Sequence, residues 1–128
     1  MSKPHRTLAE KWGIIPWLKI RVEKQPTYLK ELILPLCDDN KIVEQGVCDI
    51  AFVAPTSAAA WKQKARRLVP AIDPDGVIWV LYPKEDFREK YNFDGSLPEM
   101  VHIVKDLGLK QTKLVSVNNE LTSARFSL

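Results

Sequence analysis

The chain carries two short apolar runs, at residues 48–54 and 77–82, and each run is closed by a proline. The first run is mostly apolar and the second is apolar throughout, which is typical of strands buried on both faces of a parallel sheet. Between them lies an amphipathic helical pattern whose apolar face is Trp61, Ala65, Leu68 and Ile72. A strand, a helix and a second strand in this order predict a right-handed parallel crossover over a buried sheet.

Two helices outside this unit are marked by capping boxes. Thr7 with Glu10 predicts an opening helix over residues 7–12, and Ser96 with Glu99 predicts a later helix that ends at Gly108. In both boxes the hydroxyl side chain can accept from a free backbone N–H of the first turn. These signals place helices at the start of the chain and after the polar segment 84–95.

The remaining patterns predict further strands, one helix and two turns. They are strands at 18–23, 42–43, 113–117 and 121–126, a helix at 28–36, a turn at 73–76 and a tight hairpin turn at Asn118 and Asn119. We therefore predict an α/β, Rossmann-like fold with a mostly parallel sheet, helices on both faces and a C-terminal antiparallel β-hairpin. Residues 1–128 are expected to form a single domain.

Part of the chain resembles a known enzyme fold. Residues 49–54, the segment 72–80 and the terminal hairpin are similar in order to the second half of class I methyltransferases. More closely, residues 7–14, Pro26 with Tyr28, and residues 76–84 resemble an uncharacterised family of small bacterial proteins, a domain of unknown function, over nearly the whole chain. The resemblance implies a degenerate methyltransferase-like fold and no established activity.

The cofactor loop of a methyltransferase is missing from the sequence. Such an enzyme needs a glycine-rich turn after its first strand and an acidic residue after its second. The predicted first strand is followed by Lys24, Gln25 and Pro26, and no glycine occurs between Gly13 and Gly46. We therefore predict that S-adenosylmethionine is not bound and that the chain has no cofactor.

Composition and cysteine spacing exclude several other classes of function. Cys37 and Cys48 have no CxxC spacing and no neighbouring histidine, so we predict neither a metal site nor a disulfide. No nucleophile elbow or phosphate loop occurs, and His102 lies in a predicted helix. The basic N-terminus lacks the apolar stretch of a secretory signal, so a soluble, cytoplasmic protein is expected. The sequence thus predicts no catalytic residues.

Polar residues follow the ends of three predicted strands. If these strands are parallel, their carboxyl ends lie at the same edge of the sheet. The polar residues are Lys24, Thr27, Tyr28, Thr56, Ser57 and Lys84. The carboxyl edge is where open α/β sheets bind ligands, and these groups suit a small anion. The alternative is that Thr56 and Ser57 only cap a helix and that the lysines are solvated. On this basis the predicted function is a non-catalytic domain that binds a small anionic ligand.

Two surfaces suggest macromolecular partners instead. The helical residues Lys62, Lys64, Arg66 and Arg67 form a basic face, although no nucleic-acid motif accompanies it and the net charge is only +3. We therefore expect a solvated face and no nucleic-acid or membrane partner. Trp12 and Trp17 flank a turn, so either could anchor a homodimer or a protein partner, unless the opening helix buries both. A protein-interaction module is thus the second predicted function, and methyl transfer is the third.

Overall fold

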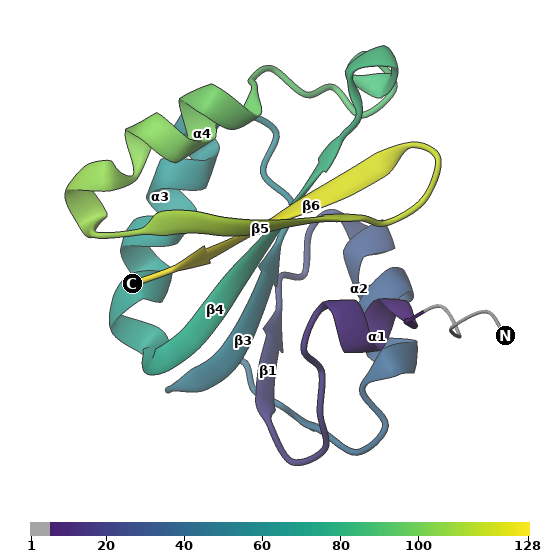
Figure 1. Cartoon of the computed structure of the whole chain (residues 1–128), viewed down its shortest axis with the longest axis vertical. Helices are drawn as coiled ribbons and strands as arrows, with labels where there is room; N and C mark the ends of the chain where they lie inside the picture. The colour runs from purple at the N-terminus through teal and green to yellow at the C-terminus, as the bar shows by residue number, and fades with distance from the viewer. Residues whose placement is uncertain (1–5) are drawn as a thin grey trace, which may run out of the picture.

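The computed structural model describes residues 6–128, in which six strands form one sheet of order β2-β1-β3-β4-β6-β5. The strands are β1 (Lys19–Val22), β2 (Lys41–Ile42), β3 (Cys48–Val53), β4 (Ile72–Pro83), β5 (Lys110–Ser116) and β6 (Leu121–Ser127). The α-helices are α1 (Leu8–Lys11), α2 (Thr27–Ile33), α3 (Ala58–Leu68) and α4 (Leu97–Ile103). Strands β2, β1, β3 and β4 pair in parallel, and β6 pairs antiparallel with both β4 and β5 (Figure 1).

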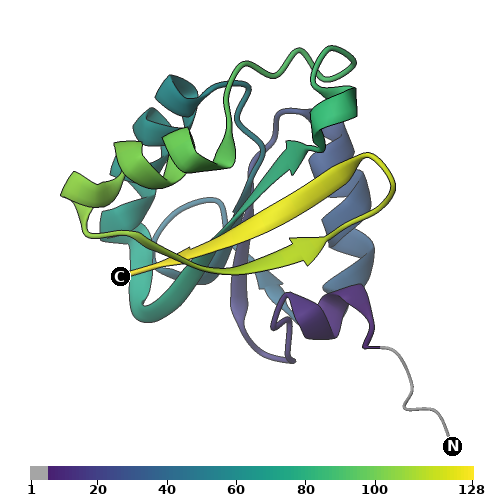
Figure 2. The same ribbon diagram turned by 45° about the horizontal axis from the view of Figure 1, so that its top comes forward.

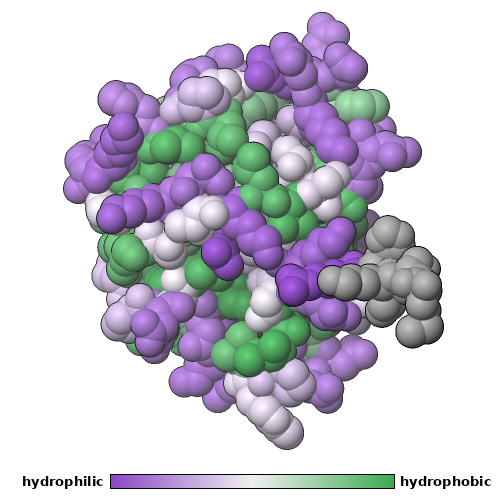
Figure 3. Space-filling view, in the orientation of Figure 1, coloured by the Kyte–Doolittle hydropathy of each residue, from purple (hydrophilic) through white to green (hydrophobic). Residues whose placement is uncertain are grey.

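Helices cover both faces of the sheet, as the sequence predicts. Figures 1 and 2 show α1 and α2 on one face and α3 and α4 on the other. Each face has its own hydrophobic core, one built around Trp61 and Phe126 and the other around Trp12, Phe52 and Trp79. The space-filling view shows apolar side chains along the line between α4 and β5 on an otherwise mixed surface (Figure 3). The α/β fold class with its C-terminal antiparallel hairpin is confirmed.

The opening helix is locked onto the sheet by hydrogen bonds from two indoles. Thr7 caps α1 as predicted, and Gly13 ends it at a φ of 75°. The buried Trp12 ring donates from Nε1 to Ser123 Oγ at 3.0 Å, and Trp79 Nε1 donates to the Trp12 carbonyl at 2.9 Å. Trp12 is therefore a core residue, and its prediction as a surface anchor is wrong because α1 folds back over the sheet.

The turn predicted at residues 73–76 lies within a strand. Helix α3 ends at Leu68, Pro70 falls in a short 3₁₀ turn, and Ile72 already pairs with Cys48. The next pair is Ile50 with Val77, so β4 bulges between them. At Gly76 an added Cβ would lie 2.7 Å from the Asp49 carbonyl oxygen, so only glycine allows the two strands to approach there.

The hairpin turn also differs from the expected one. Neither Asn118 nor Asn119 has a positive φ. Instead Asn118 Oδ1 accepts from the backbone N–H groups of Glu120 and Leu121, each at 2.8 Å, which is an Asx-type turn. The loop is therefore longer than a two-residue turn.

Within residues 6–128, no helix has the length and apolar character needed to cross a bilayer.

The buried position of Trp79 leads to a stability prediction. Trp79→Ala removes a ring that is 0% exposed and deletes the hydrogen bond to Trp12, so it should lower the free energy of unfolding by about 3–5 kcal/mol. Urea denaturation measures this loss. The control is Trp17→Ala, at a ring that is 87% exposed, which should change stability by less than about 0.5 kcal/mol. Equal effects of the two changes would contradict the packing described here.

Candidate functional site

The sheet has a topological switch point between β1 and β3. The chain leaves β1 through α2 to reach β2 on one side, and then returns to β3 on the other side of β1. Both strands end at the same edge, so the segments that follow them diverge around a crevice. Ligands of open α/β sheets bind at such a crevice. Residues that follow β1 line one cavity, and residues that follow β3 line another.

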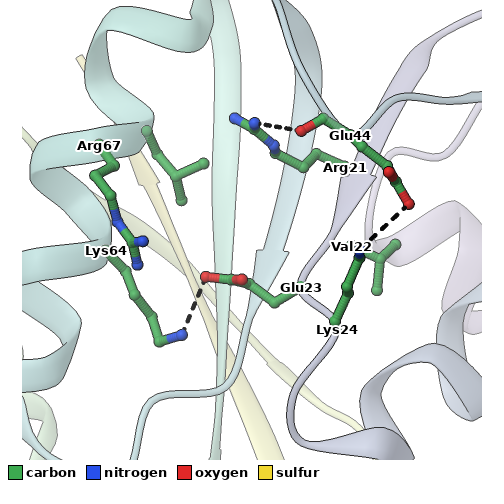
Figure 4. A pocket seen from close by; sticks show the side chains of 8 residues that line it. Arg21, Val22, Glu23, Lys24, Glu44, Lys64 and Arg67 are labelled. Carbon is green, nitrogen blue, oxygen red and sulfur yellow. Dashed lines mark hydrogen bonds and ion pairs between the residues drawn. The ribbon is translucent and has the colours of Figure 1, made fainter.

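We name the first the charged cavity, and Figure 4 shows it from close by. Its volume is about 280 Å³, and it is lined by Arg21, Val22, Glu23, Lys24, Glu44, Lys64, Arg67 and Leu68. Alternation along β1 explains the lining, because Ile20 and Val22 are buried while Arg21 and Glu23 face the other way, toward α3. The cavity thus lies between the end of β1, the segment after β2 and α3.

Charges of both signs meet in the charged cavity. Lys64 Nζ lies 3.0 Å from Glu23 Oε1, and both side chains are largely shielded from solvent. Arg21 donates from Nη2 to the Glu44 carbonyl oxygen at 2.6 Å, while Lys24 Nζ lies 3.9 Å from Glu44 Oε1 in an exposed pair. The carboxylate of Glu44 therefore has only a loose ionic contact and is accessible from the cavity.

Glu44 is the residue of this site that sequence reasoning missed. It follows β2 after a single intervening residue, which is the place where a methyltransferase needs an acid. Strand β2 is only two residues long and both are exposed, so the sequence has no apolar pattern that locates the end of this strand. The acid that follows it was therefore not recognised. An acid within two residues of the predicted strand at 42–43 was the available signal.

We name the second the aromatic cavity. It measures about 260 Å³ and is lined by Pro26, Tyr28, Ala54, Pro55, Thr56, Pro83, Lys90, Tyr91, Asn92 and Phe93. The rings of Tyr28 and Tyr91 meet edge to face with centroids 5.6 Å apart, and Phe93 stacks on Tyr82 at 6.1 Å. These residues come from the start of α2, the ends of β3 and β4, and the segment after β4.

Glu120 anchors the segment after β4 to the hairpin loop. Its carboxylate accepts from the Tyr91 hydroxyl at 2.6 Å and from Lys90 Nζ at 2.7 and 2.9 Å. The hydrogen bond to Glu120 is the main cause that raises the pKa of Tyr91 from 10.0 to about 12. Conversely, Lys90 and then Tyr91 lower the pKa of Glu120. One wall of the aromatic cavity is therefore tied down by a charge-assisted network.

The six residues predicted to bind a ligand do not lie together in the structure. Lys24 lines the charged cavity, and Tyr28 and Thr56 line the aromatic cavity. Thr27, Ser57 and Lys84 line neither.

Each residue outside the cavities has a local position that explains this. Thr27 is exposed at the start of α2, and Ser57 Oγ accepts from Ala60 N as the cap of α3. Lys84 Nζ donates to Ser116 Oγ at 2.9 Å, which directs it toward β5 and away from the switch point.

The structure also describes the two surfaces that the sequence analysis considered for macromolecular partners. Lys62 pairs with Asp106 at 3.2 Å and Lys64 pairs with Glu23, so two cations of the basic helix face are neutralised. Trp17 is exposed and adopts a φ of 77°, in a segment held by the hydrogen bond from Trp17 N to the Asp39 carbonyl. Its role at an interface stays a prediction.

Comparison with known proteins identifies the fold family through structure. Neither a protein-family profile nor a curated protein sequence matches the chain. Solved structures do match it. LepI in its complex with SAM has a TM-score of 0.59 at 16% identity, over 94% of this chain and 39% of LepI. The pyocyanin biosynthetic protein PhzM has a TM-score of 0.68 at 11% identity, over 92% and 52%.

A third solved structure is covered more fully. A TehB-like SAM-dependent methyltransferase from Corynebacterium glutamicum has a TM-score of 0.57 at 11% identity, over 92% of this chain and 84% of that protein. The chain spans well under two thirds of LepI and PhzM. At this level of identity the likeness shows that the chain has a methyltransferase-like fold.

These neighbours correct the functional prediction from sequence. A non-catalytic domain that binds a small anion was expected, with methyl transfer placed last. That order is contradicted, because the solved proteins of this fold include SAM-dependent methyltransferases and one complex with SAM. The prediction from sequence rested on the missing glycine turn and did not consider Glu44.

The Glu120 network leads to a pH prediction. Glu120→Gln should lower the pKa of Tyr91 from about 12 toward 10.0, because the largest cause of the raised value is lost. Tyrosinate absorbance in an alkaline titration measures it, and Tyr91→Phe identifies which transition belongs to Tyr91.

The sign for stability follows from linkage. Since folding raises this pKa, the contribution of the network is present below pH 10.0 and is lost as pH rises through about 12. An unchanged alkaline transition in Glu120→Gln would contradict the hydrogen bond.

Proposed function

We propose that this chain is a SAM-dependent methyltransferase domain that binds the ribose of its cofactor at Glu44. The observation that carries the proposal is the position of this carboxylate, directly behind β2 and at the rim of the charged cavity. An acid at the end of this strand binds ribose hydroxyls in the dinucleotide-binding relatives of the fold. The methyltransferase-like fold supports the same assignment.

The residues of the charged cavity fit the nucleoside part of the cofactor. The Glu44 side chain is 72% exposed, and its contact with Lys24 at 3.9 Å is too long for a hydrogen bond. Its two oxygens can therefore accept from two ribose hydroxyls. Leu68 supplies apolar lining for a base. The volume of about 280 Å³ lies just below the range of about 300–1,000 Å³ that is typical of ligand pockets.

The segment after β1 must act differently from a glycine turn. Residues Glu23 to Pro26 place side chains where a glycine turn would expose backbone, and Pro26 offers no N–H group. In this chain the polar contacts at that position come from side chains, with Lys24 and Arg67 as the cations that can meet a carboxylate of the cofactor. Specificity for the cofactor would then rest on charge pairing as well as on the ribose.

The reaction requires little acid–base chemistry from the protein. When bound, the cofactor supplies a methyl group on a sulfonium sulfur, which is already electrophilic. The protein then has to hold cofactor and acceptor in line and exclude water, which is catalysis by proximity and orientation. Walls tied together by the Glu120 network and by the cap of α3 suit such a positioning role.

Further expectations accompany the proposal and rest on the sequence. We propose that residues 1–128 act as a single domain, that it works in the cytoplasm, and that it belongs to the uncharacterised family of small bacterial proteins that it resembles. A homodimer or protein partner that uses Trp17 stays an additional proposal, supported by the exposure of that ring.

The test is a calorimetric titration with SAM and with S-adenosylhomocysteine. Glu44→Gln keeps the shape of the side chain but removes its charge, so it should weaken binding by about 10- to 100-fold, the effect of losing hydrogen bonds to a charged group. The matched control is Glu89→Gln, at an exposed carboxylate that lines neither cavity. Failure of the unaltered protein to bind either compound at millimolar concentration would contradict the proposal, as would equal weakening by both substitutions.

A further inference from the structure

The aromatic cavity is separate from the position proposed for the cofactor. Lys24 lines the charged cavity and Pro26 lines the aromatic one, so a single short segment after β1 borders both. The aromatic cavity also reaches the ends of β3 and β4 through Pro55 and Pro83. A molecule bound there would be next to the switch point without occupying the space beside Glu44.

Most of the residues that line this cavity have an apolar or aromatic ring. Three prolines, Pro26, Pro55 and Pro83, contribute ring surfaces, and Tyr28, Tyr91 and Phe93 contribute aromatic rings. Tyr28 and Tyr91 already pack edge to face against each other. An aromatic ligand could pack against the same rings in the same geometry. Rigid surfaces of this kind favour a planar ligand, because they cannot fold around a flexible one.

The charge balance of the cavity favours a neutral ligand. Lys90 is its only cationic lining residue, and both oxygens of Glu120 bind the Lys90 ammonium group. A neighbouring hollow that Tyr28 and Tyr91 also line includes Glu31, which adds negative charge nearby. An anion would therefore find no uncompensated positive charge in the aromatic cavity.

Two polar groups at the cavity are available to orient a ligand. The Tyr28 hydroxyl and the Asn92 side-chain amide have no hydrogen-bond partner within residues 6–128, although both residues line the cavity. Burial raises the pKa of Tyr28, so its hydroxyl stays protonated at neutral pH and can donate. A ligand oxygen is the natural partner for such a donor.

We propose that the aromatic cavity binds a small, neutral, planar aromatic molecule through ring contacts and through an oxygen that accepts from the Tyr28 hydroxyl. This inference rests on the proposed function in one respect, since the ligand would be the methyl acceptor. At about 260 Å³ the cavity has room for one or two rings and excludes larger acceptors such as a folded protein segment.

The test uses 4-methoxyphenol as the probe, with 4-methoxycyclohexanol as its saturated counterpart and benzoate as an anionic one. In amide-resolved NMR titrations of the full chain, 4-methoxyphenol should give saturable shifts at Tyr28, Thr56 and Asn92. The two counterparts should not. Tyr28→Phe keeps the ring and should weaken binding by about 3- to 10-fold, as expected for the loss of one neutral hydrogen bond.

The control variant is Trp17→Ala, which removes an exposed aromatic ring outside the cavity and should leave the probe affinity unchanged. Absence of saturable shifts at the cavity, or shifts that centre on Trp17, would overturn the proposal. Tighter binding of benzoate than of the phenol would overturn it as well.

The same protein titrated with S-adenosylhomocysteine separates the two proposals. Cofactor binding without phenol binding contradicts only the aromatic site. Phenol binding at the cavity without cofactor binding supports the aromatic site and contradicts only the methyltransferase assignment.

Discussion

Three buried indole N–H groups hold this molecule together. Each needs an acceptor away from water, and each finds it on a different layer or element: Trp12 on Ser123 of β6, Trp61 on the Met100 carbonyl of α4, and Trp79 on the Trp12 carbonyl. An unsatisfied buried donor costs about 1–3 kcal/mol, so these bonds select one arrangement of helices on the sheet. The placement of α1 on the sheet and the contact between α3 and α4 both use them.

The same packing explains why the two cavities at the carboxyl edge of the sheet differ in character. Because both faces are covered near β3 and β4, the ends of these strands emerge from a rigid core, and the segments beyond them can form walls. Beside β1 the cover on the α3 side is incomplete, and charged side chains occupy that face. The contrast between an apolar, aromatic cavity and a charged one therefore follows from how far the helices extend over the sheet.

Local patterns in the sequence predicted the fold well but did not mark the contacts that form the candidate site. Capping at Thr7 and Ser96 and the apolar runs of β3 and β4 are properties of neighbouring residues, and the structure confirms them. The bulge at Gly76 depends on the Asp49 carbonyl across the sheet, and the Tyr91 hydroxyl finds Glu120 29 residues away. Glu44 was not recognised because it follows β2, a two-residue strand that forms by pairing with β1 and has no strand pattern of its own.

The position of β6 has a consequence for biosynthesis. This strand is the last of the six in chain order, yet it lies between β4 and β5 and contributes Ala124 and Phe126 to one core and the Ser123 hydroxyl that accepts from Trp12 on the other face. A nascent chain that ends before these residues holds β4 with an unpaired edge and Trp12 without its acceptor. Such an intermediate exposes apolar surface and an open strand edge, the two features that recruit chaperones and promote aggregation. The sheet should therefore be completed only after β6 has been synthesised.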